Sequence, residues 1–254
     1  MTDFPQQAHL ISTEDGSFSL FCEEIGECYH SRFGAKSEAM GLYIRASQIA
    51  ERWRNASPLY VLDVGLGLGY NALCTLESWL ADPQAAAPLC LTSFEKNQAL
   101  FNSLRIVQGP WQVNWPESWR SWIQALAPIS ALHSTTSGEV WKAHIPHPTR
   151  PIACEWTCVT GDIRETLFAH APSSGWERIW YDPFSAKKAP ELWAAPWLTQ
   201  LRTCVAPSVT LVTYSVARSV REAFAQAGWS WEKVPTDTGK RSWLRVRRND
   251  FPSA

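Results

Sequence analysis

The 254-residue sequence lacks the features that mark membrane, secreted and metal-binding proteins. No apolar run is long enough to span a bilayer, and the N-terminus, with Asp3 and Glu14, has no basic-then-apolar secretion pattern. The seven cysteines are odd in number and form no Cys-x-x-Cys pair, which argues against a disulfide framework or a zinc site. We therefore expect a cytoplasmic protein without a bound metal ion.

An excess of charge of one sign and flexible linkers are also missing. The formal net charge is −1, so the bulk electrostatics do not require a nucleic-acid partner. There is no internal repeat and no low-complexity linker, and the length suits one α/β domain. We expect a single domain over residues 1–254, with an N-terminal hairpin extension at 1–45 and an inserted hairpin at 133–157.

What the sequence does contain is a glycine-rich run directly after an apolar segment. Residues 59–63 predict a buried parallel strand, three glycines follow at alternate positions, and a helical pattern begins next. Glycines let a ligand lie against bare backbone, and the N–H groups at a helix start favour polar or anionic ligand atoms. The run predicts a ligand site at the carboxyl edge of a sheet, formed by Asp63, Gly65, Gly67, Gly69 and Asn71.

The spacing of these glycines distinguishes two kinds of cofactor site. A dinucleotide site has Gly-x-Gly-x-x-Gly, whereas this sequence has Gly-x-Gly-x-Gly with an acid two residues before the first glycine. The pattern resembles motif I of the class I methyltransferases, which bind S-adenosyl-L-methionine. The alternatives are a NAD-dependent oxidoreductase and a glycine turn without a ligand.

Acidic residues follow two further predicted strands. Glu95 and its neighbour Lys96 come after the apolar run 89–94. A carboxylate there can accept the ribose hydroxyls of a cofactor, or it can be an acid at a helix start. Gly161-Asp162 follows another strand. Class I methyltransferases commonly use an aspartate at this place to hold the adenine amino group, and the alternative is simple capping of the next helix by Asp162.

A later strand ends in Asp182-Pro183-Phe184-Ser185. Amine methyltransferases often carry an Asp/Asn-Pro-Pro-Tyr tetrapeptide here, so the match is partial. Pro183 would restrict the backbone and direct the Asp182 carboxylate across the pocket. That carboxylate could orient a substrate ammonium group and accept its proton.

The order of the predicted elements indicates the fold class. Strands alternate with helices through most of the chain, which is typical of an α/β protein with a mostly parallel sheet. The segments 229–234 and 243–247 predict an antiparallel pair at the C-terminus. We expect a Rossmann-like sheet of the class I methyltransferase type with an antiparallel C-terminal strand. A single helix is expected over 37–54.

The segment 180–193, Trp-Tyr-Asp-Pro-Phe-Ser-Ala-Lys-Lys-Ala-Pro-Glu-Leu-Trp, resembles the signature of the MnmC/MnmD-type tRNA methyltransferases. The segments 211–215 and 239–241 resemble later parts of that family. Tyr29-His30-Ser31 and Glu38-Ala39 resemble its N-terminal elements. The resemblance covers almost the whole chain.

The resemblance implies a reaction and its partners. The family methylates the exocyclic amine of 5-aminomethyl-(2-thio)uridine at the tRNA wobble position, with S-adenosyl-L-methionine as donor and the anticodon stem-loop as partner. Fused relatives make the amine with a flavin oxidase domain, so here a separate enzyme would supply it. The alternatives are a methyltransferase of another amine, a NAD-dependent oxidoreductase, and a non-catalytic S-adenosyl-L-methionine- or RNA-binding module.

Together, the strand-end pattern and the resemblance give a set of site residues. The expected catalytic residue is Asp182. The expected cofactor-binding residues are Asp63, Gly65, Gly67, Gly69, Asn71, Glu95, Lys96, Gly161, Asp162, Tyr29 and Glu38. The expected substrate-binding residues are Phe184, Lys187, Lys188, Tyr214, Lys240 and Arg241.

Overall fold

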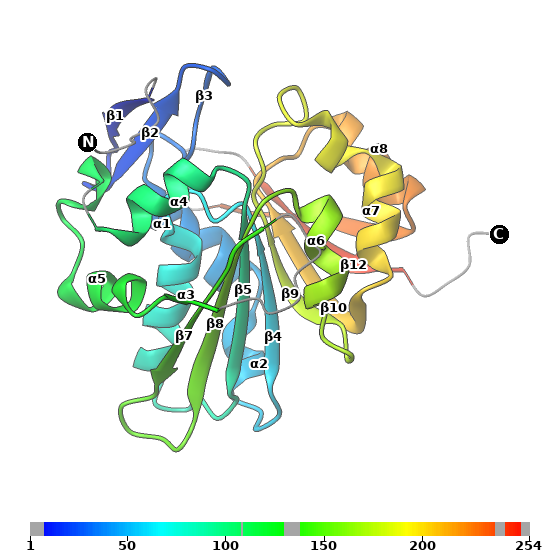
Figure 1. Cartoon of the computed structure of the whole chain (residues 1–254). Helices are drawn as coiled ribbons and strands as arrows, with labels where there is room; N and C mark the ends of the chain where they lie inside the picture. Colours follow the sequence, from blue (N-terminus) through cyan, green and yellow to red (C-terminus); the bar gives the residue numbers. More distant parts are fainter. Residues whose placement is uncertain (1–7, 108, 130–137, 237–241, 250–254) are drawn as a thin grey trace.

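The computed structural model describes residues 8–107, 109–129, 138–236 and 242–249 (Figure 1). The chain begins with a small antiparallel sheet in the order β1-β2-β3, made of Ala8–Ser12, Phe18–Cys22 and Glu27–Cys28. The predicted N-terminal hairpin corresponds to β2 and β3. Strand β1 was not predicted, and it pairs with β2 over five residues from Ala8↔Cys22 to Ser12↔Phe18.

A mixed sheet forms the centre of the molecule. Within the described residues it has nine strands in the order β11-β12-β10-β9-β4-β5-β8-β7-β6. The five middle strands run parallel, namely β10 (Val205–Thr213), β9 (Trp176–Tyr181), β4 (Leu59–Val64), β5 (Leu89–Glu95) and β8 (Ala153–Thr160). Their carboxyl ends meet at one edge of the sheet, so the loops after β4, β5, β8 and β9 come together there.

Antiparallel strands lie at both sides of the parallel strands. Strand β12 (Trp243–Arg248) runs antiparallel to β10 and to β11 (Trp229–Val234), which confirms the predicted C-terminal pair. At the other side, β7 (Val140–Pro146) pairs with β8 and with β6 (Ala127–Pro128). The predicted α/β, mostly parallel fold class is confirmed.

The hairpin expected at 133–157 is present, but it is not a separate insertion. Its second strand, β8, pairs in parallel with β5 from Leu89↔Cys154 to Glu95↔Thr160. This strand is therefore part of the central sheet, and β7 with β6 widens that sheet. The sequence pattern could not distinguish the two arrangements, because a buried parallel strand and a hairpin strand share the same apolar composition.

Two groups of helices cover the sheet and enclose two hydrophobic cores. One face carries the helices α3 (Tyr70–Ala81), α4 (Gln98–Arg105), η2 (Pro110–Gln112) and α5 (Glu117–Gln124) together with the segments from residue 35 to 53. The other face carries α6 (Ile163–His170), η3 (Pro190–Trp193), α7 (Ala195–Arg202) and α8 (Arg218–Gln226) (Figure 1). In the described part of the chain, no helix is long and apolar enough to cross a membrane.

The single helix expected at 37–54 is divided into three parts. These are α1 (Ala35–Glu38), the π-helix η1 (Ala39–Ala46) and α2 (Ile49–Trp53). Between the last two, Gln48 has a left-handed backbone with φ of 59°, which interrupts regular helix geometry. The wide π turn is rare in proteins and is often found next to functional sites.

Tryptophan side chains fill much of the interior, as expected from the sequence. Eight of them are among the largest fully buried side chains of the described residues, namely Trp53, Trp79, Trp111, Trp119, Trp156, Trp176, Trp180 and Trp243. Some also make buried polar contacts. The indole of Trp180 donates to Thr75 Oγ1 at 3.0 Å, which ties β9 to α3.

An ion pair between α2 and β9 holds α2 to the sheet. Arg52 Nε and Nη2 each donate to the Glu177 carboxylate at 2.9 Å, and both side chains are only 15% exposed. We expect Arg52→Ala to lower the free energy of unfolding by about 2–3 kcal/mol, because Glu177 would keep a desolvated charge without its partner.

The measurement is chemical and thermal unfolding of the variant beside the parent protein, with an expected fall in Tm of about 5–10 °C. Arg218→Ala is the matched control, because Arg218 pairs with Glu222 on an exposed helix surface and is 85% exposed. This control should change stability by no more than about 0.5 kcal/mol. Equal effects of the two substitutions would contradict a stabilising role of the Arg52–Glu177 pair.

Candidate active site

A cavity of about 690 Å³ lies at the carboxyl edge of the parallel strands. The ends of β4, β5, β8 and β9 and the loops after them form one side, and residues 22–31 of the N-terminal sheet form the opposite side. Its size suits a cofactor together with part of a substrate. The predicted site residues that line it are Tyr29, Glu38, Gly65, Gly67, Glu95, Lys96, Gly161, Asp162, Asp182, Phe184, Lys188 and Tyr214.

Some predicted site residues lie elsewhere. Gly69 is the N-cap of α3, and Lys187 is exposed to solvent next to the cavity. Asn71 is not among the residues that line the cavity, but it donates a hydrogen bond to Asp182, which does line it. Lys240 and Arg241 lie outside the described residues.

Asp63 does not reach the cavity, although the glycine motif predicts a ligand role for it. Side chains alternate along β4, so Leu62 and Val64 face one core and Asp63 faces the other. Asp63 is completely buried and accepts a hydrogen bond of 2.8 Å from Ser93 Oγ. Burial raises its pKa well above the ordinary value for aspartate. The structure therefore places Asp63 in the core beside Ser93 of β5 and not in the cavity wall.

The glycine loop leaves a bare backbone surface in the cavity. Gly65 has φ of +90°, and a Cβ atom there would lie 2.8 Å from the carbonyl oxygen of Asp182. Gly67 has φ of +53°, and its Cβ would lie 3.3 Å from Tyr29 Cδ1. Both the backbone conformation and the available space thus require glycine at these two positions.

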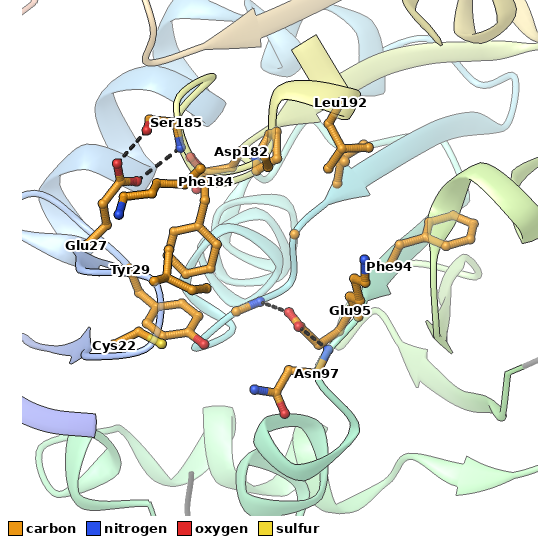
Figure 2. A pocket seen from close by; sticks show the side chains of 18 of the residues that line it. Cys22, Glu27, Tyr29, Phe94, Glu95, Asn97, Asp182, Phe184, Ser185 and Leu192 are labelled. Atoms are coloured by element: carbon orange, nitrogen blue, oxygen red, sulfur yellow. Dashed lines mark hydrogen bonds between the residues drawn. The ribbon is translucent and has the colours of Figure 1, made fainter. Parts of the chain in front are cut away.

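Glu95 lies beside this loop and orders it. Its Oε2 accepts the Gly67 N–H at 2.8 Å and its Oε1 accepts the Asn97 N–H at 2.7 Å (Figure 2). Burial raises the pKa of Glu95, while hydrogen bonds from the backbone N–H groups of Asn97, Gly67 and Lys96 act in the opposite direction. A carboxylate has about four acceptor positions, so one remains for a hydroxyl donor. The residue can therefore order the protein backbone and also bind a ribose.

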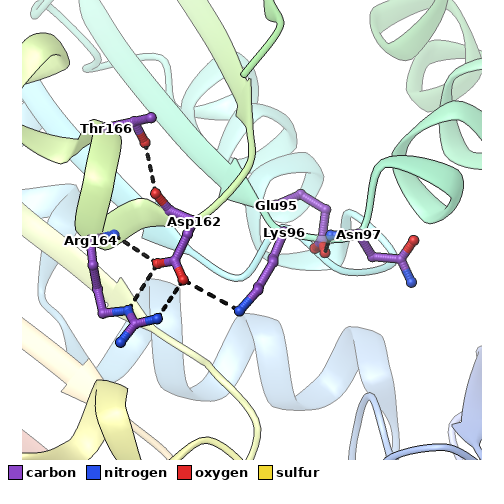
Figure 3. A network of polar contacts seen from close by, with 6 residues as sticks. All are labelled: Glu95, Lys96, Asn97, Asp162, Arg164 and Thr166. Carbon is purple, nitrogen blue, oxygen red and sulfur yellow. Dashed lines mark hydrogen bonds and ion pairs between the residues drawn. The ribbon is translucent and has the colours of Figure 1, made fainter. Parts of the chain in front are cut away.

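Asp162 is the centre of an ionic network at the start of α6 (Figure 3). Its Oδ1 accepts the Arg164 N–H at 3.0 Å, so it caps the helix as the simpler alternative predicted. Arg164 Nη2 and Lys96 Nζ reach its Oδ2 at 2.6 and 3.3 Å. The hydrogen bonds from Arg164 hold the pKa of Asp162 well below its usual range. Asp162 is therefore a fixed anion at the cavity wall.

Asp182 follows β9 and faces the cavity from the edge of the sheet. Its backbone N–H donates to Val64 O at 3.0 Å, and its Oδ2 accepts Asn71 Nδ2 at 2.9 Å. Asn71 is 2% exposed, so the carboxylate is held from the protein side. Tyr43, on the π-helix, is buried next to Asp182, and burial followed by the charge of Asp182 raises its pKa. Tyr43 was missed, because no local motif marks it.

The three residues after Asp182 are each fixed by a different part of the protein. Tyr214 Oη donates to Pro183 O at 3.0 Å, and Trp193 Nε1 donates to Phe184 O at 2.7 Å. Ser185 is bound by Glu27, a residue that the sequence analysis also missed.

Carboxylates dominate the charge of the cavity wall. The described cationic side chains that line it are Lys96 and Lys188, while the acidic ones are Glu24, Glu27, Glu38, Glu95, Asp162, Asp182 and Glu191. Such a wall favours cationic ligands. Among the described residues, no group of three histidine, cysteine or acidic side chains is placed to hold a metal ion.

Comparisons with known proteins place this site in a family. Residues 139–249 match a family model described as S-adenosyl-L-methionine-dependent methyltransferase. A protein of Aromatoleum aromaticum, the tRNA 5-methylaminomethyl-2-thiouridine biosynthesis bifunctional protein MnmC, is 31% identical over 96% of this chain. A protein of the same name from Azoarcus sp. is 31% identical over 94% of the chain. The chain spans about a third of the length of these relatives, 36% and 35%.

A solved structure has the same fold. The crystal structure of MNMC2 from Aquifex aeolicus superposes with a TM-score of 0.70 at 23% identity, covering 98% of this chain and 72% of that one. The expected methyl donor and the expected resemblance are thus confirmed. Residues 139–249 therefore match the S-adenosyl-L-methionine-dependent methyltransferases, and the chain as a whole is similar to the MnmC proteins.

Proposed function

We propose that this protein methylates the exocyclic amine of 5-aminomethyl-(2-thio)uridine at the tRNA wobble position, giving the 5-methylaminomethyl product. The observation that carries the proposal is that Asp182, held by Asn71, shares one cavity with the glycine loop and Glu95. A methyl donor on the loop and an amine at Asp182 would therefore be neighbours. The names of the MnmC relatives support tRNA as the substrate.

The residues present fit S-adenosyl-L-methionine. Bare backbone at Gly65 and Gly67 leaves space for the donor, and Glu95 offers free lone pairs to the ribose hydroxyls. Gly161 and Asp162 border the part of the cavity where an adenine would lie. The acidic wall suits the positive charges of the donor. When bound, S-adenosyl-L-methionine supplies an electrophilic methyl group.

Asp182 would prepare the amine for attack. An alkylamine is mostly protonated near neutral pH, like a lysine side chain, and a protonated amine cannot act as a nucleophile. The Asp182 carboxylate would bind the ammonium group, orient it and accept its proton. Asn71 fixes the carboxylate by its 2.9 Å hydrogen bond, so its orientation is set before the substrate binds.

The substrate would contact the part of the cavity wall formed by the N-terminal sheet and the segment after Asp182. Phe184 and Tyr29 are in edge-to-face contact there, with ring centroids 5.0 Å apart, and they offer an aromatic surface to a base. Lys188 lines the cavity and Lys187 is exposed beside it, so both are placed to approach RNA phosphates. The proposal includes an anticodon stem-loop partner, an enzyme activity that supplies the amine, and a cytoplasmic location.

The test of the proposal is transfer of label from methyl-labelled S-adenosyl-L-methionine to tRNA. We expect label in tRNA that carries 5-aminomethyluridine and none in unmodified tRNA, because only the former presents the amine. Labelling of neither RNA by a protein that binds the donor would contradict the proposed substrate and favour a non-catalytic module. NADH binding would favour the oxidoreductase alternative.

Substitution Asp182→Ala tests the catalytic residue. We expect kcat to fall by about 10²–10⁴-fold, the range of general acid–base effects, because the amine would lose its proton acceptor. Since Asp182 is proposed to bind the substrate amine and not the donor, the Kd for S-adenosyl-L-methionine, measured by calorimetry, should change less than about threefold. An equal loss of turnover and donor affinity would exclude the assigned role.

Substitution Gly67→Ala tests the donor surface of the loop. A Cβ at Gly67 would point into the space beside Tyr29 in a left-handed backbone, so we expect donor affinity to fall about tenfold or more. Gly16→Ala is the matched control, because Gly16 also has a positive φ, +79°, but no atom lies within 4 Å of its Cβ position. The control should lose a little stability and bind the donor normally. Unchanged donor affinity in Gly67→Ala would remove the loop from the binding site.

A further inference from the structure

The N-terminal sheet and the segment after Asp182 are joined by one side chain, that of Glu27. Its Oε2 accepts the backbone N–H of Ser185 at 3.1 Å, and its Oε1 accepts the Ser185 hydroxyl. Both carboxylate oxygens are therefore used by the same residue. Figure 2 shows Glu27 reaching Ser185 on the side of the cavity opposite to Glu95 and Asn97.

The same two elements also meet through rings and a cation. Tyr29, two residues after Glu27, contacts the Phe184 ring edge-on, with centroids 5.0 Å apart. Lys188 Nζ lies 3.3 Å from the position that a Cβ of Gly26 would take. Residues 26–29 of the N-terminal sheet thus lie beside the segment 184–188 in the cavity wall.

Glu27 lies in a different part of the chain from the other residues that bind the segment after Asp182. Tyr214 and Trp193, which bind Pro183 O and Phe184 O, belong to the part of the chain that continues from the segment itself. The Glu27 contact spans 158 residues and comes from outside the central sheet. The two hydrogen bonds between Glu27 and Ser185 link the N-terminal sheet to the segment after Asp182.

We propose that Glu27 is a positioning residue for the substrate side of the site. It fixes Ser185, which keeps the neighbouring Phe184 ring against Tyr29 and maintains the wall on which the substrate base lies. The inference rests on the proposed function for the identity of the substrate. Glu27 itself bonds to Ser185 and not to the glycine loop or Glu95 in the described contacts, so we expect its removal to affect the substrate side more than the donor side.

A first experiment measures the segment without any substrate. Amide hydrogen exchange is followed by mass spectrometry in the peptide that covers 184–189 for the parent protein, Glu27→Ala and Glu27→Gln. We expect exchange in this peptide to be about tenfold faster in Glu27→Ala, because the Ser185 N–H loses a charged acceptor. Glu27→Gln keeps a carbonyl acceptor and should recover most of the protection.

Glu23→Ala is the matched control. Glu23 directly follows β2 of the same sheet, pairs with His9, and is not among the residues that line the cavity. Its removal changes the charge of the sheet equally but leaves the Ser185 contact intact. Exchange that is equally fast in Glu27→Ala and Glu23→Ala would overturn the proposal, as would unchanged exchange in Glu27→Ala.

A second experiment separates the two sides of the cavity by kinetics with aminomethylated tRNA. We expect Glu27→Ala to lower kcat/KM for the RNA about tenfold or more while the Kd for S-adenosyl-L-methionine stays within about twofold. Ser185→Ala in the Glu27→Ala background should add little, because both substitutions break the same contact. Equal loss of donor affinity, or unchanged kcat/KM for the RNA, would overturn the positioning role. If the parent protein methylates no RNA, the proposed function fails, and the exchange experiment alone decides the role of Glu27.

Discussion

The backbone of the glycine loop lies directly against the segment that carries Asp182, and the site depends on this approach. The Asp182 N–H bonds to Val64 O at 3.0 Å, and no side chain fits at Gly65, where a Cβ would be 2.8 Å from Asp182 O. The contact brings the ends of β4 and β9 together at the centre of the sheet. It makes one cavity out of the donor side and the amine side, which is the requirement for direct group transfer.

The acidic residues at the strand ends have different partners and are therefore suited to different roles in the site. Glu95 accepts hydrogen bonds from backbone N–H groups, and Asp162 is neutralised by Arg164 and Lys96. Asp182 accepts a hydrogen bond from the neutral amide of Asn71. The first two are therefore suited to ordering and binding. Asp182 lies beside the neutral side chains of Asn71 and Tyr43, and its carboxylate can bind a cation and accept a proton.

The sequence predicted those parts of the site that local patterns determine. The glycine loop, Glu95, Asp162 and Asp182 all follow apolar strands, and parallel strands bring such ends to one edge. Other features depend on packing between distant segments. Glu27 and Tyr43 are not part of any local sequence motif. The alternation of side chains along β4 directs Asp63 into the core instead of the cavity. A π-helix is found where the sequence pattern predicted a regular α-helix. Strand β1 and the place of β8 in the sheet likewise depend on partners that periodicity cannot identify.

The Glu27–Ser185 contact has a consequence for how the protein acquires its site during synthesis. Its partners are separated by 158 residues, so the N-terminal sheet emerges from the ribosome long before the strand that leads to Ser185. Until then, the Glu27 carboxylate lacks its Ser185 partner. Contacts of such long sequence separation form late, since the loop between them must first be ordered. We therefore expect the substrate wall of the cavity to be completed late in folding.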